Sequence, residues 1–265
     1  MTVIEALILG LVQGLTEFLP VSSSGHLVLA EHLLDLSCDD ITFEVAIHFA
    51  TLLAVLVYFS RSLSHVFFSP FKMIAGRRSD DTRRGFRMFI AVCLGTIPAA
   101  VVGLLFKDQI ESAFSSVLLV SILLLVTSAI VFSTRFAVAG GTSIGVGRGF
   151  LIGCAQALAI LPGISRSGST IAAALFSGID REEAFNFSFI LSLPAIVGAS
   201  ALTAIDMFEA GVPEGEVAYF VGMAAAFASG YLSLVALKRL VIGGKFHLFG
   251  FYTLIVGLIG IIFLR

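Results

Sequence analysis

Two polar breaks in an otherwise apolar chain constrain its fold more than any other feature. The first break, Gln13 to His26, reads QGLTEFLPVSSSGH, and the second, Leu161 to Gly168, reads LPGISRSG. A helix that breaks at proline and glycine leaves backbone N–H groups without partners, and lipid cannot satisfy them. Each break must therefore face protein or a water-filled cavity, where ionisable residues mark a functional site.

The composition places the chain in a membrane. Of its 265 residues, 58% are hydrophobic and 13% are charged, whereas a soluble domain carries about 25% charged residues. We therefore expect a single integral membrane domain over residues 1–265 and no nucleic-acid partner. The three cysteines are scattered and predict neither a disulfide nor a metal site. Glu5 interrupts the first apolar run, so no cleaved signal peptide is expected.

The apolar segments predict an all-α polytopic membrane protein with six transmembrane helices, since a crossing takes about 20 residues. The six expected crossings are 43–59, 87–106, 115–133, 184–205, 217–237 and 246–264. The two broken segments are pairs of pieces too short to cross, 3–18 with 26–35 and 148–161 with 168–178. We interpret these pairs as re-entrant broken-helix hairpins.

Basic residues gather on one side of this topology. The 61–87 connection carries seven Lys and Arg residues, the 134–148 connection two, and the 238–245 connection three, with Arg181 on the same side. The 206–216 connection on the other side is purely acidic. Because Lys and Arg favour the cytoplasmic side, we expect both termini outside. The first hairpin then enters from outside and the second from inside.

The two hairpins resemble each other at a constant offset. Gln13 lies over Gln156, and Ser22–Gly25 lies over Ser165–Gly168. Each hairpin is followed by three expected crossings, and an odd number of crossings turns the second copy upside down. The sequence therefore predicts an inverted-topology repeat, with copies over about 1–134 and 147–265 and hairpin tips that meet near the bilayer midplane.

If the tips meet, they form an anion site. Arg166 is the one basic residue in the breaks, and an intramembrane arginine needs an anionic partner. Gln13 and Glu17 are four residues apart and share a helix face. Helices expected to begin just after Gly25 and Gly168 would aim N–H groups into the same space, where phosphate is the expected anion. The polar residues expected here are Gln13, Glu17, Ser22, Ser23, Ser24, His26, Ser165, Arg166, Ser167, Ser169 and Thr170.

Other polar groups have plainer interpretations. Glu44 and His48 are expected to face water at a helix end, and Ser188 to form interhelical hydrogen bonds. The Arg-rich 77–87 run is expected to anchor the chain on anionic lipid at the cytoplasmic face.

Two segments match the signature motifs of a known family. One motif is Glu or Gln followed four residues later by Glu, then a serine-rich turn and His, as in Gln13–His26. The other is Pro-Gly-x-Ser-Arg-Ser-x-x-Thr, as in Pro162–Thr170. On these segments, with Phe43–Val45 and Gly95–Gly103, the chain resembles the bacitracin-resistance family of undecaprenyl-diphosphate phosphatases nearly end to end. The motif allows either Glu or Gln at position 13, and this chain has Gln13. A metal site that uses two carboxylates is therefore less favoured here.

The resemblance implies hydrolysis of the C55 isoprenoid diphosphate to its monophosphate, which recycles the lipid carrier of peptidoglycan and cell-wall synthesis and confers bacitracin resistance. It also implies a multi-pass protein of the bacterial cytoplasmic (inner) membrane with an active site open to the outer, periplasmic face. The implied partners are the prenyl diphosphate and the bilayer, and a homodimer is left open.

Within this family reading, Ser23 is the expected nucleophile and Arg166 the expected phosphate clamp. Glu17 is favoured as the base, with His26 as the alternative. A divalent cation, Mg²⁺ or Ca²⁺, is expected to bridge Glu17 and the diphosphate, with Gln13 as a further ligand. The expected phosphate-binding residues are Ser22, Gly25, Ser165, Ser167, Gly168 and Thr170.

One alternative belongs to another functional class. Inverted repeats with broken helices are also transporter architecture, so the same anion site suits a transporter or flippase of a prenyl phosphate. The fold cannot decide between the two, because function depends on the site. A nucleophile beside an acid/base pair favours the enzyme.

Overall fold

The computed structural model describes residues 1–34, 41–138, 140–210 and 216–264. These residues form helices and no named strand, and an isolated β-bridge joins Thr142 to Ile179. The elements are α1 (Val3–Phe18), α2 (Ser23–Leu34), α3 (Ile41–Tyr58), α4 (Ser60–Ile74), α5 (Asp80–Leu105), α6 (Lys107–Phe114), α7 (Val117–Ser133), η1 (Thr134–Phe136), α8 (Val146–Leu158), α9 (Arg166–Phe176), α10 (Arg181–Ala210), α11 (Glu216–Ile242), η2 (Phe246–Leu248) and α12 (Phe249–Phe263).

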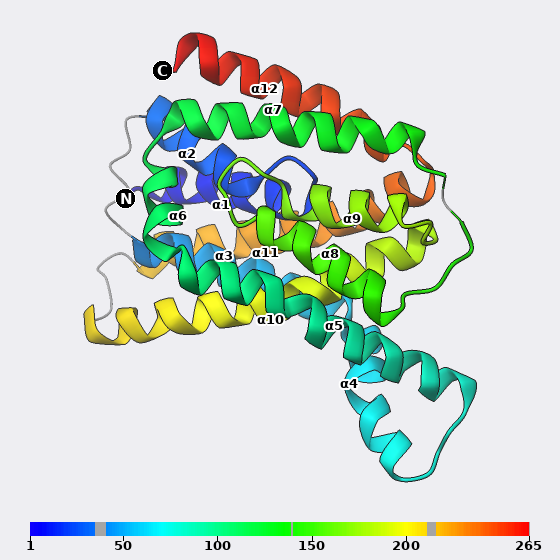
Figure 1. Ribbon diagram of the computed structural model, residues 1–265. Coiled ribbons are helices and arrows are strands. Elements are labelled where there is room, and N and C mark those ends of the chain that lie inside the picture. The colour runs from blue at the N-terminus through cyan, green and yellow to red at the C-terminus, as the bar shows by residue number, and fades with distance from the viewer. Residues whose placement is uncertain (35–40, 139, 211–215, 265) are drawn as a thin grey trace.

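The long helices run roughly side by side, and both termini lie at the same end of the bundle (Figure 1). The short helices α1 and α2 enter from that end, whereas α8 and α9 enter from the opposite end (Figure 1). The connection between α7 and α8 and the α4–α5 hairpin lie at the end away from the termini (Figure 1).

The described helices fit a multi-pass membrane protein. Four are long and apolar enough to cross a bilayer, namely α5, α7 extended to Phe136, α11, and η2 with α12. The pair α3 and α4 makes a fifth candidate, bent by 74° at their junction. All six crossings expected from the sequence fall on helices, so the all-helical fold class is confirmed.

Glycines let the helices pack closely where the bundle is densest. Gly10 of α1 lies against the backbone of Gly222 in α11, and Gly153 of α8 lies against the backbone of Gly95 in α5. A side chain at Gly10 or Gly153 would overlap the carbonyl oxygen of its partner. Helices in lipid associate through such close van der Waals contacts between small residues, because lipid removes the hydrophobic drive.

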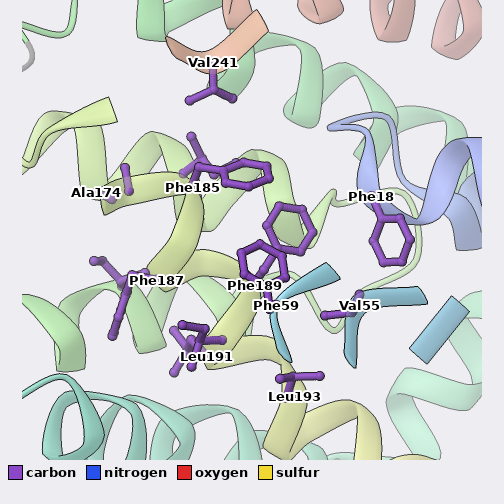
Figure 2. Packing of buried hydrophobic residues seen from close by; sticks show 14 of the residues in the cluster. Phe18, Val55, Phe59, Ala174, Phe185, Phe187, Phe189, Leu191, Leu193 and Val241 are labelled. Carbon is purple, nitrogen blue, oxygen red and sulfur yellow. The ribbon is translucent and has the colours of Figure 1, made fainter. Parts of the chain in front are cut away.

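An aromatic cluster fills the interior beside the first break. Phe189 of α10 has its ring centroid 5.8 Å from Phe18, 5.6 Å from Phe59 and 4.9 Å from Phe185. Figure 2 shows these rings together with the aliphatic residues around them. Phe18 is 1% exposed and is the last residue of α1. The cluster thereby fixes the end of α1, and with it the neighbouring Glu17.

Three local expectations were wrong. The 61–87 connection is mostly helical, since α4 occupies its first half and α5 begins at Asp80, and α6 follows α5 in a place where no helix was expected. The short helices α2 and α9 begin at Ser23 and Arg166, before Gly25 and Gly168. Serine caps at their N-termini start these helices earlier than the glycines suggested.

Candidate active site

The two breaks meet inside the bundle. The amide of Gly163, from the α8–α9 break, donates to Ser22 Oγ in the α1–α2 break over 3.1 Å. Arg166 at the start of α9 contacts Glu17 near the end of α1 at 2.7 Å. These contacts join residues more than 140 positions apart, as expected if the tips converge.

Glu17 is the centre of the site. Its Oε1 accepts from the Arg166 guanidinium at 2.7 Å, while its Oε2 accepts from Ser23 Oγ at 2.5 Å and from Gln13 Nε2 at 3.0 Å. The Glu17 side chain is 9% exposed and that of Arg166 is 20% exposed. The Ser23 hydroxyl therefore already donates a hydrogen bond to a carboxylate, which is the arrangement that general-base activation requires.

The two short helices begin with the same cap. Ser22 Oγ accepts from the amide of Gly25 at 3.3 Å, and Ser165 Oγ accepts from the amide of Gly168 at 3.1 Å. Each capping hydroxyl also lies beside the serine two positions on, Ser24 at 3.2 Å and Ser167 at 3.3 Å. The caps leave the N–H groups of the first two residues of each helix without intrahelical acceptors. These donors suit an anion, as at other helix N-termini.

Ser22 and Gly25 show why the turn is built from small residues. Ser22 has φ = +67°, the left-handed conformation that side chains rarely adopt. A Cβ on Gly25 would lie 3.2 Å from Leu124 Cδ2 and 3.3 Å from Gly163 Cα. Glycine at this position therefore lets the two breaks approach each other.

Thr127 of α7 supports the second break. Its Oγ1 donates to the carbonyl of Gly163 at 2.7 Å and accepts from the amide of Ser165 at 2.9 Å. One hydroxyl therefore satisfies two backbone groups that the broken helix leaves free. Gly163 itself has φ = +93°, which glycine adopts without strain.

His26 is held on both ring nitrogens. Nδ1 lies 2.9 Å from the carbonyl of Ser22, and Nε2 lies 2.8 Å from the hydroxyl of Tyr252 in α12. The two rings also stack, with centroids 5.5 Å apart. A carbonyl only accepts, so a neutral His26 carries its hydrogen on Nδ1 and accepts from Tyr252 on Nε2.

His48 of α3 approaches Glu17 from the other side, with Nε2 3.9 Å from Oε2. Its Nδ1 lies 2.8 Å from the carbonyl of Glu44, so the neutral ring presents an unprotonated Nε2 to the carboxylate. A proton on either His48 Nε2 or the Glu17 carboxyl makes the contact between these two groups attractive. Because His48 is 37% exposed, it connects the nearly buried Glu17 with solvent.

The remaining polar residues of the second break are buried in the first turns of α9. Thr170 is 0% exposed, and its hydroxyl donates to the Arg166 carbonyl at 2.8 Å and lies 2.5 Å from Ser188 Oγ. The expected interhelical hydrogen bond of Ser188 is thereby confirmed. Ser167 and Ser169 are buried, at 3% and 6% exposure.

The donor set near Glu17 suits a divalent cation in part. Gln13 is 0% exposed, and its Oε1 is a buried acceptor without a hydrogen-bond partner. Mg²⁺ and Ca²⁺ prefer oxygen ligands such as this amide and the Glu17 carboxylate. No group of three or more His, Cys, Asp and Glu side chains in the described residues could hold a metal ion. The chain thus offers two oxygen ligands here, and substrate oxygens would have to complete the set.

The structure brings Glu17, Ser22 and Ser23 of the first break together with Gly163 and Arg166 of the second. His26 contacts Tyr252 instead, and Thr170 contacts Ser188. The structure also adds three residues that the sequence patterns missed or assigned elsewhere. Thr127 and Tyr252 lie in apolar helices and gave no signal of their own. His48, expected to face water at a helix end, also reaches Glu17. Its position four residues after Glu44, inside an apolar segment, was the one available hint.

Comparisons with known proteins agree with these motifs. The family profile described as "Bacitracin resistance protein BacA" matches residues 6–259. A protein of Desulfosudis oleivorans named undecaprenyl-diphosphatase is 44% identical over 263 residues, covering 96% of each chain. Proteins of the same name from Korarchaeum cryptofilum and, as undecaprenyl-diphosphatase 2, from Bacillus thuringiensis are 41% and 39% identical, covering 97% and 99% of this chain and 98% of each relative.

Proposed function

This chain belongs to the bacitracin resistance protein BacA family, and from that premise we propose that it is an undecaprenyl-diphosphatase. It hydrolyses undecaprenyl diphosphate to undecaprenyl phosphate and inorganic phosphate. The observation that carries this proposal is Ser23 donating to Glu17, whose other carboxylate oxygen pairs with Arg166. The Glu17 carboxylate, as the base, thus contacts both the nucleophile Ser23 and the phosphate clamp Arg166.

The first step forms a covalent phosphoserine. Ser23 Oγ attacks the terminal phosphorus, the bridging P–O bond breaks, and undecaprenyl phosphate leaves with the bonding electrons. Glu17 takes the hydroxyl proton, because it is the carboxylate that Ser23 already contacts. Water then attacks the phosphorus of the phosphoserine, and Glu17, which has by then released its first proton, takes the proton of the water. The Ser23 Oγ–P bond breaks, inorganic phosphate departs, and Glu17 returns that proton to Ser23 Oγ.

Arg166 and the helix N-termini stabilise the charge that develops on the phosphoryl oxygens. Thr170 and Ser188 support the first turn of α9, since the Thr170 hydroxyl donates to the Arg166 carbonyl and contacts the Ser188 hydroxyl. The hydroxyl of Ser22 is buried and engaged with two amides, so it shapes the turn that presents Ser23.

Two histidines assist at different places. His48 lies between Glu17 and solvent, and it transfers to water the proton that Glu17 has accepted from Ser23. His26 is oriented by Tyr252 and by the Ser22 carbonyl. Its role in the proposed mechanism is to assist the departure of the phosphate. A divalent cation held by Glu17 and Gln13 with substrate oxygens would neutralise part of the diphosphate charge.

We further propose the finer topology of six crossings and two re-entrant hairpins related by an inverted repeat. It is supported by hairpins that enter from opposite ends (Figure 1) and by caps at equivalent positions, Ser22 with Gly25 and Ser165 with Gly168. The basic connections then face the cytoplasm and the site opens to the outer face of a bacterial inner membrane. Hydrolysis at such a site returns the lipid carrier to cell-wall synthesis, and this recycling accounts for bacitracin resistance.

The test is phosphate release from a prenyl diphosphate by the purified protein in detergent with a divalent cation. Ser23→Ala should lower kcat by more than about 1000-fold, because it removes the nucleophile. Ser24→Ala is the matched control, since it removes the neighbouring hydroxyl of the same cap and should stay within about threefold of the wild type. Near-normal turnover by Ser23→Ala would remove the assigned role. Absence of any release by the wild-type protein would instead favour the prenyl-phosphate transporter.

A further inference from the structure

The α4–α5 hairpin is unlike the rest of the bundle. Helix α4 leaves α3 at a bend of 74°, so it runs across the direction of the spans and projects beyond them at the end away from the termini (Figure 1). The catalytic site does not use this hairpin. Its position and composition point to a separate role.

Helix α4 has one face on α5 and one face uncovered. Leu63, Val66 and Ser69 are buried, at 7%, 2% and 0% exposure. Ser69 lies against Gly85 of α5, and Leu63 and Val66 belong to the hydrophobic core. The opposite face carries an aromatic stripe, defined as the set of large apolar side chains one helical turn apart that α5 does not cover. The stripe consists of Phe68, Phe71 and Ile74, which are 59%, 68% and 86% exposed. Phe67, at 49% exposure, lies at its edge, with its ring centroid 6.2 Å from that of Phe89 in α5.

A helix of this kind matches the interfacial helices that lie in the plane of a membrane surface. It is amphipathic, it is bent by 74° from α3, and three of its four exposed large apolar side chains are aromatic. The chain contains no tryptophan, so phenylalanine is its main aromatic residue for such a place.

The same hairpin is strongly basic. Between residues 72 and 87 it carries six Lys and Arg residues against the two carboxylates of Asp80 and Asp81. Asp81 already contacts His65 of α4 at 3.5 Å. A cluster of four to eight basic residues beside a membrane span is the pattern that recognises anionic lipids.

A cavity of about 170 Å³ lies at the base of the hairpin. Its lining is Arg84, Arg87, Met88, Ser143, Ile144 and Glu183. Glu183 is engaged, because its carboxylate accepts from the amide of Ile144 at 3.0 Å. Across the described part of the chain, neither Arg84 nor Arg87 makes an ion pair with a carboxylate.

We propose that the α4–α5 hairpin is a binding site for anionic phospholipid. The aromatic stripe enters the acyl region of the leaflet, and the cavity between Arg84 and Arg87 receives the phosphate of the headgroup. A second copy of this chain is a poorer occupant, since six like charges on each hairpin would repel. This site lies at the end of the bundle opposite the termini and is separate from the catalytic phosphate clamp.

The absence of tryptophan permits a direct measurement on the full-length protein. Phe71→Trp places the sole tryptophan of the chain on the stripe, and its fluorescence in nanodiscs reports contact with brominated lipids. Brominated phosphatidylglycerol should quench it more strongly than brominated phosphatidylcholine at equal mole fraction. Removing Arg84 and Arg87 with the pair R84Q and R87Q should reduce that preference by about fivefold for each arginine.

Two controls make the result decisive. Phe263→Trp, on an exposed residue of α12 near the C-terminus, should be quenched by both lipids equally. The arginine variants should keep wild-type phosphate release in detergent, which shows that they fold. Absence of quenching at position 71 by either lipid would overturn the proposal, and concentration-dependent energy transfer between labelled copies would assign the stripe to self-association. Equal quenching by both lipids would overturn the headgroup site. If added inorganic phosphate abolished the preference for phosphatidylglycerol over phosphatidylcholine, the cavity would instead be a site for free phosphate.

Discussion

At the scale of single residues, Glu17 determines how the site works. One carboxylate joins Ser23, the proposed nucleophile, to Arg166, the proposed phosphate clamp, so its charge and its shape both matter. A residue with this many contacts cannot be replaced without disturbing each partner. The substitutions that separate these roles therefore involve its neighbours or retain its shape.

Glu17→Gln keeps the shape and removes the base. We expect kcat to fall by about 10² to 10⁴-fold, the usual contribution of a positioned general base. Prenyl diphosphate binding, measured by displacement of a labelled analogue, should be retained or strengthened because Arg166 loses its internal anion. A variant with normal kcat would show that another group takes the Ser23 proton.

Tyr252→Phe tests the orientation of His26. The change keeps the stacked ring but removes the hydroxyl that donates to His26 Nε2. We expect kcat to fall by about fivefold, the effect of losing one hydrogen bond of about 1 kcal/mol. The same change in a His26→Ala background should have no effect. Additive losses would mean that Tyr252 acts independently of His26.

Gln13→Glu addresses the buried acceptor beside Glu17. The substitution adds a second carboxylate where Gln13 now donates to Glu17. If this position holds a divalent cation, activity should be retained and the cation concentration needed for half-maximal phosphate release should fall. A loss of activity that no cation concentration restores would show instead that the amide donor to Glu17 is essential.

The residues of the site were largely predictable from the sequence, because the two breaks carry polar side chains that lipid would reject. The contacts of Glu17 and Arg166 follow from that reasoning. Thr127 and Tyr252 could not be found in this way. A threonine hydroxyl in an apolar helix usually bonds its own backbone, and the sequence does not say where a tyrosine hydroxyl points. Only the packing of α7 and α12 shows that these two reach the breaks.

At the scale of elements, the crossings of α1 with α11 and of α8 with α5 hold the two hairpins in place. Each crossing brings a glycine of the hairpin against a glycine of a long helix, Gly10 with Gly222 and Gly153 with Gly95. Their equivalence also supports the proposed repeat, since Gly10 and Gly153 have the same offset as Gln13 and Gln156.

Gly153→Ala and Gly147→Ala make a matched pair within α8. A methyl group at 153 would overlap the backbone of Gly95, whereas nothing lies within 4 Å of one at 147. We expect Gly153→Ala to destabilise the protein by about 1 to 3 kcal/mol, the usual effect of overpacking. Gly147→Ala should be neutral or slightly stabilising. Thermal unfolding in detergent measures both, and equal melting temperatures would contradict the close crossing.

Element boundaries were predicted less well than element positions. The starts of α2 and α9 were placed after the glycines, because glycine was treated as the end of each break. In the structure Ser22 and Ser165 cap the helices and the glycines lie in the first turn. Helix α4 was missed because its polar and basic residues resemble a loop, and its apolar face is evident only at helical spacing.

At the scale of the whole molecule, the charge distribution and the course of the chain support one orientation. Both termini lie at one end of the bundle, and the basic α4–α5 hairpin lies at the other (Figure 1). The positions of the apolar helices followed from the apolar segments, whereas α4 and α6 did not. Their arrangement could be expected only through the repeat, because composition alone does not say which helices are neighbours.

Cysteine labelling in whole cells tests the orientation. In a background in which Cys38, Cys93 and Cys154 are replaced by alanine, Gln109→Cys on α6 should react with an impermeant thiol reagent added outside. Ser79→Cys, at the start of α5, should react only after the membrane is permeabilised. The reverse pattern would invert the proposed topology.

The pairing of Glu17 with Arg166 also has a consequence for timing. In the substrate-free protein, the base and the clamp neutralise each other at 2.7 Å. An arriving diphosphate competes for the guanidinium, and the carboxylate it displaces is the one bound to Ser23. In the proposed mechanism, Ser23 therefore gains its base only when a phosphate is present to receive the attack, and the substrate-free protein does not react.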